Sequence, residues 1–419
     1  MKALHFVHHS FPVADGYSIR TRYIVQSQQK LGLDPVVVTR PGFLRECPRK
    51  LEFREKIDGI PHLHFTDTDY PLVRAAHRWR KATRYLERRY AVPYYRRVFS
   101  ECKPCSVFHV HMQPDQLQCL LPLSRRYKVP LIFEIRGIWE DTEVACGHIL
   151  PDSIRYKKRR DASTQAARDA DLVITISEAL RNDFVSRGIS PDRITVIPNG
   201  VDTSLFVPRA RDAELAARLE LTDRIVFGYI SSIRQLEGID YLVKAMPAIL
   251  GSIPNGVCLI VGDGDYASQL RALVDKLGLT NKVILTGRVR HKLILAYYSL
   301  IDIFVVPRTD ARVNHFVTPL KPLEAMSMAK ALLVSGVGGL TELVQDGQTG
   351  LVFRPEDSAD LAAKATLLAQ NPELRLRLGD AARRHVVSKL DWTKVIGRYP
   401  ASVTACRESL ASVPDAGKP

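Results

Sequence analysis

The stretch of sequence that decides the fold is Thr318-Pro-Leu-Lys-Pro-Leu-Glu-Ala-Met-Ser-Met-Ala-Lys-Ala-Leu-Leu-Val-Ser335, which continues as Gly-Val-Gly-Gly-Leu-Thr-Glu342. Its pattern predicts a loop, a short helix, an apolar strand and a glycine turn that opens a second helix. Lys321 and Glu324 stand three residues apart where the first helix begins, so they share one face. A helix start favours phosphate, and a carboxylate beside it can accept hydrogen bonds from vicinal hydroxyls. The pair therefore suits a nucleotide-sugar, with an ordinary surface ion pair as the alternative.

The same alternation of apolar runs and helical patterns extends along the whole chain. Amphipathic stretches such as 19–31 and 178–187 lie between the strand-like runs. Strands that alternate with helices predict parallel sheets in doubly wound, Rossmann-like α/β domains. The predicted strands are 3–7, 35–39, 62–65, 107–111, 130–135, 172–176, 194–197, 225–230, 257–261, 283–286, 303–306, 332–335 and 350–353.

The length of 419 residues exceeds what one hydrophobic core usually supports, so we predict two domains. The turn-rich segment 197–208 is the natural linker. We place an N-terminal domain at 1–203, a C-terminal domain at 204–393, and a final segment at 394–419 that returns to the N-terminal domain and ends in a tail. A cleft between the carboxyl ends of two such sheets is where ligands are expected to bind.

Composition is that of a soluble globular protein, with 46% hydrophobic and 25% charged residues. No run of ~18 apolar residues predicts a membrane span, and the start of the chain reads as a first strand rather than a signal peptide. The net charge of +15 is concentrated in residues 1–200, which carry 33 Lys and Arg against 22 Asp and Glu. This asymmetry predicts an anionic partner: a membrane surface, nucleic acid or a phosphorylated substrate.

The seven cysteines are odd in number and irregularly spaced, so they predict no disulfide framework. Cys102-Lys-Pro-Cys105 has redox or half-zinc spacing, but no second pair follows and the motif precedes a strand. We expect no metal or redox role and a reducing cytosol.

Polar residues follow several of the predicted strands. In the first half these are His111, Arg136 within Glu134-Ile-Arg-Gly-Ile-Trp-Glu-Asp141, and Gly16 just before a helix. Such positions are typical of ligand sites in doubly wound sheets. Packing histidines, a structural ion-pair cluster and a plain turn are the respective alternatives. In the second half the strand ends carry Ser232, Arg234, Gly262, Arg288 and Arg308, whose joint placement favours a nucleotide cradle.

At these residues the chain resembles the retaining GT-B glycosyltransferases of family 4, over about residues 1–390. The matching motifs are Pro198-Asn-Gly-Val-Asp202, Val261-Gly-Asp-Gly264, Thr286-Gly-Arg288, Leu323-Glu324-Ala-Met326, Gly338-Gly339-Leu-Thr-Glu342 and Asp346-Gly-Gln-Thr-Gly350. Pro319-Leu-Lys-Pro-Leu-Glu324 and Ile135-Arg-Gly-Ile-Trp-Glu-Asp141 also resemble the branch found with bacterial exopolysaccharide and exosortase-linked systems.

The resemblance implies transfer of a hexosyl or N-acetylhexosaminyl group from a UDP- or GDP-sugar, with no metal or other cofactor. Glu324 would accept from the ribose hydroxyls, Gly16 would lie in the loop that closes over the diphosphate, and His111 lies in the family's His-x-His segment. The predicted catalytic residues are His111, Arg136 and Lys321. The predicted donor-binding residues are Gly16, Ser232, Arg234, Gly262, Arg288, Thr318, Pro319, Leu320, Lys321 and Glu324.

Four positions, in three motifs, depart from the family pattern. Phe316 replaces a glutamate eight positions before Glu324, Ser232 and Glu237 stand where an arginine and a lysine hold phosphate, and Arg136 replaces a frequent histidine. An acid at the phosphate lysine implies that other cations bind the diphosphate, and Lys321, Arg234 and Arg288 are the candidates.

The expected acceptor is a lipid-linked saccharide or surface polysaccharide, and the expected location is the cytoplasm, peripheral on the inner face of the cell membrane. Residues 74–97 hold eight arginines and one lysine against one glutamate, together with Trp79, Tyr85, Leu86 and Tyr90. A helix with this composition, ended or kinked by Pro93, is expected to dock on anionic membrane. A basic crossover helix packed on the sheet is the alternative.

Two other functions stay open: a non-catalytic GT-B protein that binds sugar nucleotides, and a basic nucleic-acid-binding protein, although no groove-reading or stacking motif supports nucleic acid.

Overall fold

The computed structural model describes residues 1–13, 15–66, 70, 72–73 and 79–411, with only the backbone described at 80, 84, 291 and 409–411. The chain forms two compact units. Unit 1 comprises Met1–Gly137, Lys157–Ile197 and Trp392–Pro419, and unit 2 comprises Ile138–Tyr156 and Pro198–Asp391.

These bounds differ from the predicted ones at 203 and 393. Segment 198–202 belongs to unit 2 because Asn199 Nδ2 donates to the carbonyl oxygen of Thr318 at 2.6 Å and Val201 N donates to Leu390 O at 2.9 Å. Segment 138–156, placed by the prediction in the N-terminal domain, also belongs to unit 2. The ion pair of Asp141 with Arg312 fixes it there.

Unit 1 is built on one eight-stranded sheet with the order β3-β4-β2-β1-β5-β6-β7-β8. All neighbours run parallel except β3 and β4. The strands are β1 (Lys2–Val7), β2 (Asp34–Thr39), β3 (Arg54–Ile57), β4 (Ile60–Leu63), β5 (Val107–His111), β6 (Leu131–Ile135), β7 (Leu172–Thr175) and β8 (Ile194–Val196).

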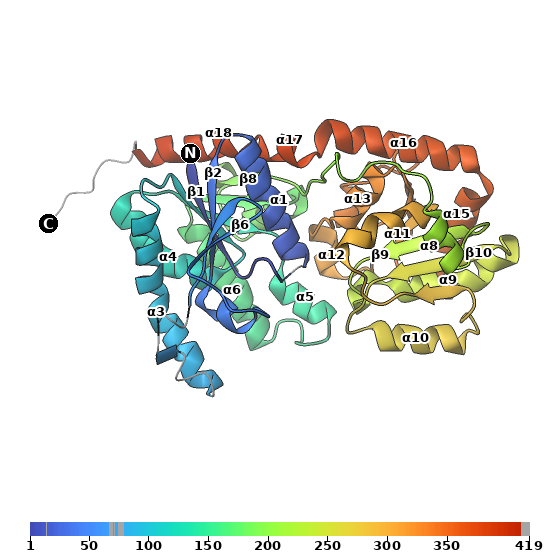
Figure 1. Ribbon diagram of the computed structural model, residues 1–419, viewed down its shortest axis with the longest axis horizontal. Coiled ribbons are helices and arrows are strands. Elements are labelled where there is room, and N and C mark those ends of the chain that lie inside the picture. The colour runs from blue at the N-terminus through green and yellow to red at the C-terminus, as the bar shows by residue number, and fades with distance from the viewer. Residues whose placement is uncertain (14, 67–69, 71, 74–78, 412–419) are drawn as a thin grey trace. The chain divides into compact units, whose positions relative to one another are not determined.

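Helices cover both faces of this sheet (Figure 1). On one face, α1 (Gly16–Lys30) packs against α17 (Trp392–Ile396), which leads into α18 (Tyr399–Ala411). The other face carries α3 (Arg80–Glu101) and α4 (Pro114–Tyr127). The described part of the final segment is grouped with unit 1. The remaining helices of unit 1 are α6 (Ile154–Asp169), which starts in unit 2, and α7 (Glu178–Ser186).

Unit 2 has a six-stranded, fully parallel sheet with the order β11-β10-β9-β12-β13-β14. Its strands are β9 (Ile225–Ile230), β10 (Gly256–Val261), β11 (Val283–Leu285), β12 (Ile303–Val306), β13 (Ala331–Ser335) and β14 (Leu351–Phe353). Two apolar cores lie against the two faces of this sheet. The helices are α5 (Trp139–Ala145), α8 (Ala213–Arg218), α9 (Ile239–Ser252), α10 (Ala267–Lys276), α11 (Ile294–Leu300), α12 (Arg312–Phe316), α13 (Lys321–Ser327), α14 (Gly338–Thr341), α15 (Ser358–Gln370) and α16 (Pro372–Lys389).

The predicted fold class is confirmed, and every predicted strand is present within a few residues. Burial on both faces explains this success, because β13 and its neighbours are continuous apolar runs, as in other parallel sheets. Edge strand β3 was missed because its sequence, Arg54-Glu-Lys-Ile57, is mostly charged. Pro93 was expected to end or kink the helix at its position; the helix does not end there, since α3 continues through it to Glu101.

Cys102 is buried, Cys105 is half-buried and both are free thiols. Burial raises the pKa of both thiols, that of Cys105 to about 12, which favours the protonated form. Among the described residues, no helix combines the length and the hydropathy needed to cross a membrane.

Candidate functional site

The pair formed by Lys321 and Glu324 lies at the start of α13 in unit 2. Lys321 Nζ lies 3.0 and 2.9 Å from the two carboxylate oxygens of Glu324. On its buried side, Glu324 accepts a hydrogen bond of 2.8 Å from the hydroxyl of Tyr298. The Glu324 residue is 7% exposed, whereas the Lys321 side chain is 26% exposed. The carboxylate is thus held from the core by Tyr298, and Lys321 pairs with it from the more exposed side.

The residues just before this helix are fixed by hydrogen bonds from Asn199. Asn199 Nδ2 donates to both the carbonyl and the hydroxyl oxygen of Thr318, which is buried. Pro319 and Leu320 follow as half-buried residues and lead into the helix. The loop therefore has one fixed end next to Glu324.

A second group of charges follows β9 and β12. Glu237 is buried and lies 3.2 Å from Arg308 Nε and 3.1 Å from Arg234 Nη2, while the Tyr229 hydroxyl donates to it at 3.0 Å. Burial acts to raise the pKa of Glu237, but the two guanidinium groups outweigh it and leave the pKa lowered. Glu237, which stands where the family has a lysine, thus forms ion pairs with two arginines.

Glycines bring the strand ends of unit 2 close together. Gly262 has φ +143°, and a Cβ on it would lie 1.8 Å from the carbonyl oxygen of Ser231. Gly238 has φ +64°, and its Cβ would lie 2.0 Å from Pro307 O. Side chains at these positions would displace the loops, so both glycines are required by the packing itself. Ser232 and Arg288 are exposed beside this edge.

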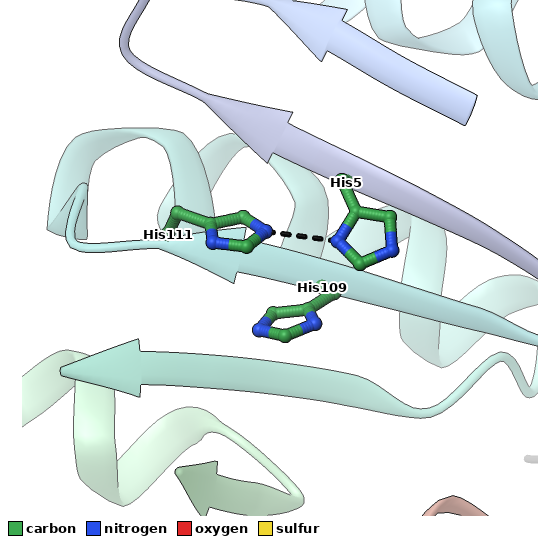
Figure 2. Close-up of side chains that lie close together, drawn as sticks. All are labelled: His5, His109 and His111. Atoms are coloured by element: carbon green, nitrogen blue, oxygen red, sulfur yellow. Dashed lines mark hydrogen bonds between the residues drawn. The ribbon is translucent and has the colours of Figure 1, made fainter. Parts of the chain in front are cut away.

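The predicted residues of unit 1 occupy a different kind of place. His5, His109 and His111 are buried at the centre of the sheet on β1 and β5 (Figure 2). His5 Nδ1 lies 2.9 Å from His111 Nε2, and the rings of His109 and His111 stack with centroids 4.2 Å apart. His5 Nε2 bonds with Gln28 Oε1 at 2.7 Å. His111, at 0% exposure, has both ring nitrogens engaged within the protein.

Glu134 is the single carboxylate of this buried network. It lies 2.7 Å from Arg20, 2.9 Å from Arg136 and 2.6 Å from His111 Nδ1. Burial raises the pKa of Glu134, but Arg136, Arg20 and His111 together hold it well below its usual range. Burial, followed by the charge of Arg136, holds the pKa of His111 well below its usual range. The network is therefore a carboxylate between two arginines, with neutral imidazoles around it.

Arg136 links the network to the loop after β1. Its Nη1 donates to the carbonyl oxygen of Tyr17 and to the hydroxyl of Thr21, at 3.0 and 2.9 Å. The Tyr17 hydroxyl in turn donates to His111 O at 2.9 Å and accepts from His8 N at 3.0 Å. Gly16 opens α1, is exposed, and a Cβ on it would meet no atom within 4 Å. The chain thus leaves open space at Gly16.

The structure brings the predicted residues together in three groups, two in unit 2 and one in unit 1. Lys321 and Glu324 form one pair with Thr318, Pro319 and Leu320 beside them, and Arg234 lies in the Glu237 group. His111 and Arg136 form the third group, in unit 1. Sequence reasoning gave no role to Tyr298 and noted Arg308 only as one of several strand-end bases. Arg308 had a usable signal, because it follows the predicted strand directly, whereas a tyrosine within a helix carries none.

Comparisons with known proteins now identify the class. A family model described as glycosyl transferases group 1 matches residues 211–385, and one described as glycosyltransferase family 4 matches residues 14–205. The solved structure of Anabaena HepE with UDP and glucose has a TM-score of 0.73 at 20% identity, covering 97% of this chain and 100% of that one. Sucrose-phosphate synthase from Thermosynechococcus elongatus also has a TM-score of 0.73 at 20% identity, with 98% and 100% covered. The fold is the two-domain GT-B fold of glycosyltransferases.

Curated relatives give the family. Alpha-D-kanosaminyltransferase of Streptomyces kanamyceticus is 31% identical over 287 residues, which is 65% of this chain and 70% of that protein. A GDP-mannose-dependent alpha-(1-6)-phosphatidylinositol monomannoside mannosyltransferase of Mycolicibacterium smegmatis is 28% identical over 256 residues, covering 60% and 66%. The chain therefore spans about two thirds of the length of these relatives. It belongs to the group 1, family 4 glycosyltransferases, which confirms the predicted family and enzyme class.

Proposed function

We propose that this protein transfers a hexosyl or N-acetylhexosaminyl group from a UDP- or GDP-sugar, with retention of configuration, to a lipid-linked or polysaccharide acceptor. The observation that carries the donor part of the proposal is the fixed carboxylate of Glu324. Its buried contact with Tyr298 leaves its remaining acceptor capacity facing the amine of Lys321, whose side chain is 26% exposed. Two vicinal ribose hydroxyls are donors that such a carboxylate can hold, with Lys321 released to another anion.

The diphosphate would be held by cations that the family pattern does not supply. Arg308 and Arg234 are kept in place by Glu237, and Arg234 is 40% exposed at its side chain. Nε of Arg234 is buried and has no hydrogen-bond partner among the described residues. Arg288 is exposed at the end of β11, and Gly262 and Ser232 would allow close backbone approach. Together with Lys321 these groups replace the missing phosphate lysine.

The proposed chemistry is departure of the nucleoside diphosphate with attack of the acceptor hydroxyl on the same face of the sugar. Charge that develops on the leaving phosphate would be stabilised by the cations of unit 2. We expect this reaction to need no metal. Of the two residues predicted as catalytic, His111 is 0% exposed and Arg136 is 9% exposed in this structure. We propose instead that they position Tyr17 and the loop before Gly16.

The acceptor and the location are proposals of the same kind. The mycobacterial relative is named for a phosphatidylinositol monomannoside acceptor, which is a lipid. In α3 the charged Lys81, Arg88 and Arg89 are exposed, while Trp79, just before the helix, is 69% exposed and Tyr85 is 63% exposed. Leu86 and Tyr90 are half-buried, and residues 74–78 of the predicted segment lie outside the described residues. This surface supports peripheral docking on the anionic inner face of the cell membrane, in surface or exopolysaccharide synthesis.

The test is a panel of UDP- and GDP-sugars incubated with the purified protein, with release of nucleoside diphosphate as the signal. Release from one donor, increased by a lipid-linked acceptor and reduced in Glu324→Gln, is expected. Tight donor binding without release would favour the non-catalytic alternative, for which the replacement of the family glutamate by Phe316 is the motivating observation. Binding of nucleic acid instead of any sugar nucleotide would overturn both.

A further inference from the structure

Two adjacent histidines just after β1 face one another with the same ring nitrogen. Nδ1 of His8 and Nδ1 of His9 lie 2.8 Å apart. Oε2 of Glu46 lies 3.9 Å from His8 Nδ1, and the candidate ligand atoms of these three residues all lie within 4.8 Å of one another. Two nitrogens this close must share either a proton or a metal ion.

We propose that His8, His9 and Glu46 bind one first-row transition-metal ion, of which Zn²⁺ is the representative, in the loop after β1. Two imidazoles and a carboxylate form a ligand set suited to Zn²⁺, Cu²⁺, Ni²⁺ or Co²⁺ rather than to Mg²⁺ or Ca²⁺. Ligand atoms at ~2.0–2.1 Å from a tetrahedral ion lie roughly 3.3 Å apart. The observed separations of 2.8 and 3.9 Å bracket that value. Three protein ligands leave one position for water or an anionic oxygen.

The second ring nitrogen of His9 is already oriented as a metal-bound histidine requires. Nε2 of His9 lies 2.8 Å from Oδ2 of Asp15, so a proton on Nε2 is donated to that carboxylate and Nδ1 keeps its lone pair. The other oxygen of Asp15 caps α1 by accepting from Ser18 N at 2.9 Å. The backbone of His8 is held by its bond to the Tyr17 hydroxyl. The loop is therefore anchored at both histidines.

His8 can become a ligand by changing its tautomer. With His9 Nδ1 as acceptor, His8 Nδ1 carries the shared proton, and that proton moves to Nε2 when a metal occupies Nδ1. No net proton release is needed.

Charge and access both favour this cluster. Asp15 and Glu46 carry two negative charges, and Arg40 offsets one of them through its 2.5 Å contact with Oε1 of Glu46. The side chains of His8 and His9 are 31% and 14% exposed, which provides a path for an ion.

The three histidines in Figure 2 are the contrasting case. They are fully buried, and Glu134 beside them is already shared by Arg20 and Arg136. A divalent ion there would add to an excess of positive charge without solvent, which is strongly unfavourable. The geometry thus points to the loop cluster and not to the buried one.

The test uses untagged full-length protein, stripped with a chelator and titrated with Zn²⁺ against a chromophoric competitor. One equivalent is expected to bind, and His8→Ala and His9→Ala should each weaken binding by at least about 10-fold. Asp15→Asn preserves a good helix cap but removes the carboxylate, and it should weaken binding roughly 10-fold. Co²⁺ should give the visible absorption of a four-coordinate site in the parent protein only.

His148→Ala is the matched control, because His148 is an exposed histidine that also faces a carboxylate, Glu143 at 3.7 Å. It should leave Zn²⁺ binding unchanged. Thermal unfolding of each stripped variant shows whether it is folded. Absence of any bound equivalent, or one that survives in the folded His8→Ala/His9→Ala double variant, would overturn the site. None of these readouts depends on the proposed sugar transfer.

Discussion

The hydroxyl of Tyr298 donates a 2.8 Å hydrogen bond to Oε2 of Glu324 from within the core of unit 2. Burial, together with the neighbouring carboxylate, raises the pKa of Tyr298 well above its usual value, so the hydroxyl remains a donor. This contact fixes the orientation of Glu324 before any ligand binds. It makes Glu324 a preorganised acceptor, which Lys321 shields in the absence of donor.

Glu324→Gln should weaken donor binding roughly 10-fold or more. A hydrogen bond to a charged acceptor is worth about 1.5–3 kcal/mol, and the amide presents a neutral one. Isothermal titration calorimetry with the active nucleotide-sugar measures the effect, with Glu342→Gln as a control of equal chemistry elsewhere in unit 2. Unchanged affinity in the folded variant would remove Glu324 from the donor site and leave the helix ion pair as its role.

Lys321→Ala should lower kcat more than it raises KM. Its amine is paired with Glu324 in this structure, and we expect it to reach the diphosphate as charge develops in the transition state. Steady-state kinetics on Lys321→Ala and Arg234→Ala separate the two candidate cations. If Lys321→Ala altered neither parameter while Arg234→Ala abolished activity, the phosphate site would belong to the loop after β9 instead.

Glu237→Ala should destabilise the protein by about 3 kcal/mol, because it leaves Arg308 buried without its carboxylate. Glu237→Lys, which restores the residue type of the family, should be worse still because a third cation would join the two arginines. Urea unfolding measures the stability of both variants, and Glu356→Ala, at an exposed acid of the same unit, is the control. A stable Glu237→Lys protein would show that the arginine group can rearrange around a lysine.

The ion pairs of the Glu237 group could not be predicted from the sequence, whereas most of the strands could. The alternation of apolar runs was sufficient for every strand of the two sheets except the charged edge strand β3, since strands such as β9, β12 and β13 are continuous buried apolar runs. Glu237 looked like a defect in a phosphate loop, because its partner Arg308 is 71 residues away in the chain. The network around Glu134 has the same property: Arg20 lies 114 residues away from it. Ion pairs over such separations depend on topology and have no local signal.

Stability should fall as the pH is lowered from 6.5 towards 4. Burial, the nearby His109 and other charges lower the folded pKa of His5 to about 3, whereas the unfolded value is near 6.5. The unfolded chain then binds a proton that the folded one excludes, so the free energy of unfolding rises with pH across that window. Each such proton is worth about 1.4 kcal/mol per pH unit at most. Glu134, with its lowered pKa, adds to the loss below pH ~4.5.

Urea unfolding between pH 5 and 7 measures this slope. If the variant folds, His5→Gln should reduce the slope by an amount that corresponds to at most one proton taken up on unfolding. His148→Ala, at an exposed site, should leave the slope unchanged. A slope of zero in the parent protein would mean that the buried histidines bind protons in the folded state.

The membrane prediction is tested on the described part of the basic segment. Arg88→Glu/Arg89→Glu reverses two exposed charges on α3, and Trp79→Ser removes an exposed aromatic ring at its start. Near an anionic surface each basic residue is worth about 1 kcal/mol, so the double reversal should weaken vesicle binding by more than about 10-fold. Arg209→Glu/Arg224→Glu, at two exposed positions of unit 2, makes the same change in net charge and should have little effect.

Sedimentation with vesicles of rising phosphatidylserine content, at rising salt, gives the affinity. Equal binding to neutral and anionic vesicles would contradict the prediction, as would equal losses in the two charge-reversed proteins, because net charge alone would then explain the attraction. Binding to RNA with the same dependence on Arg88 and Arg89 would assign the surface to nucleic acid.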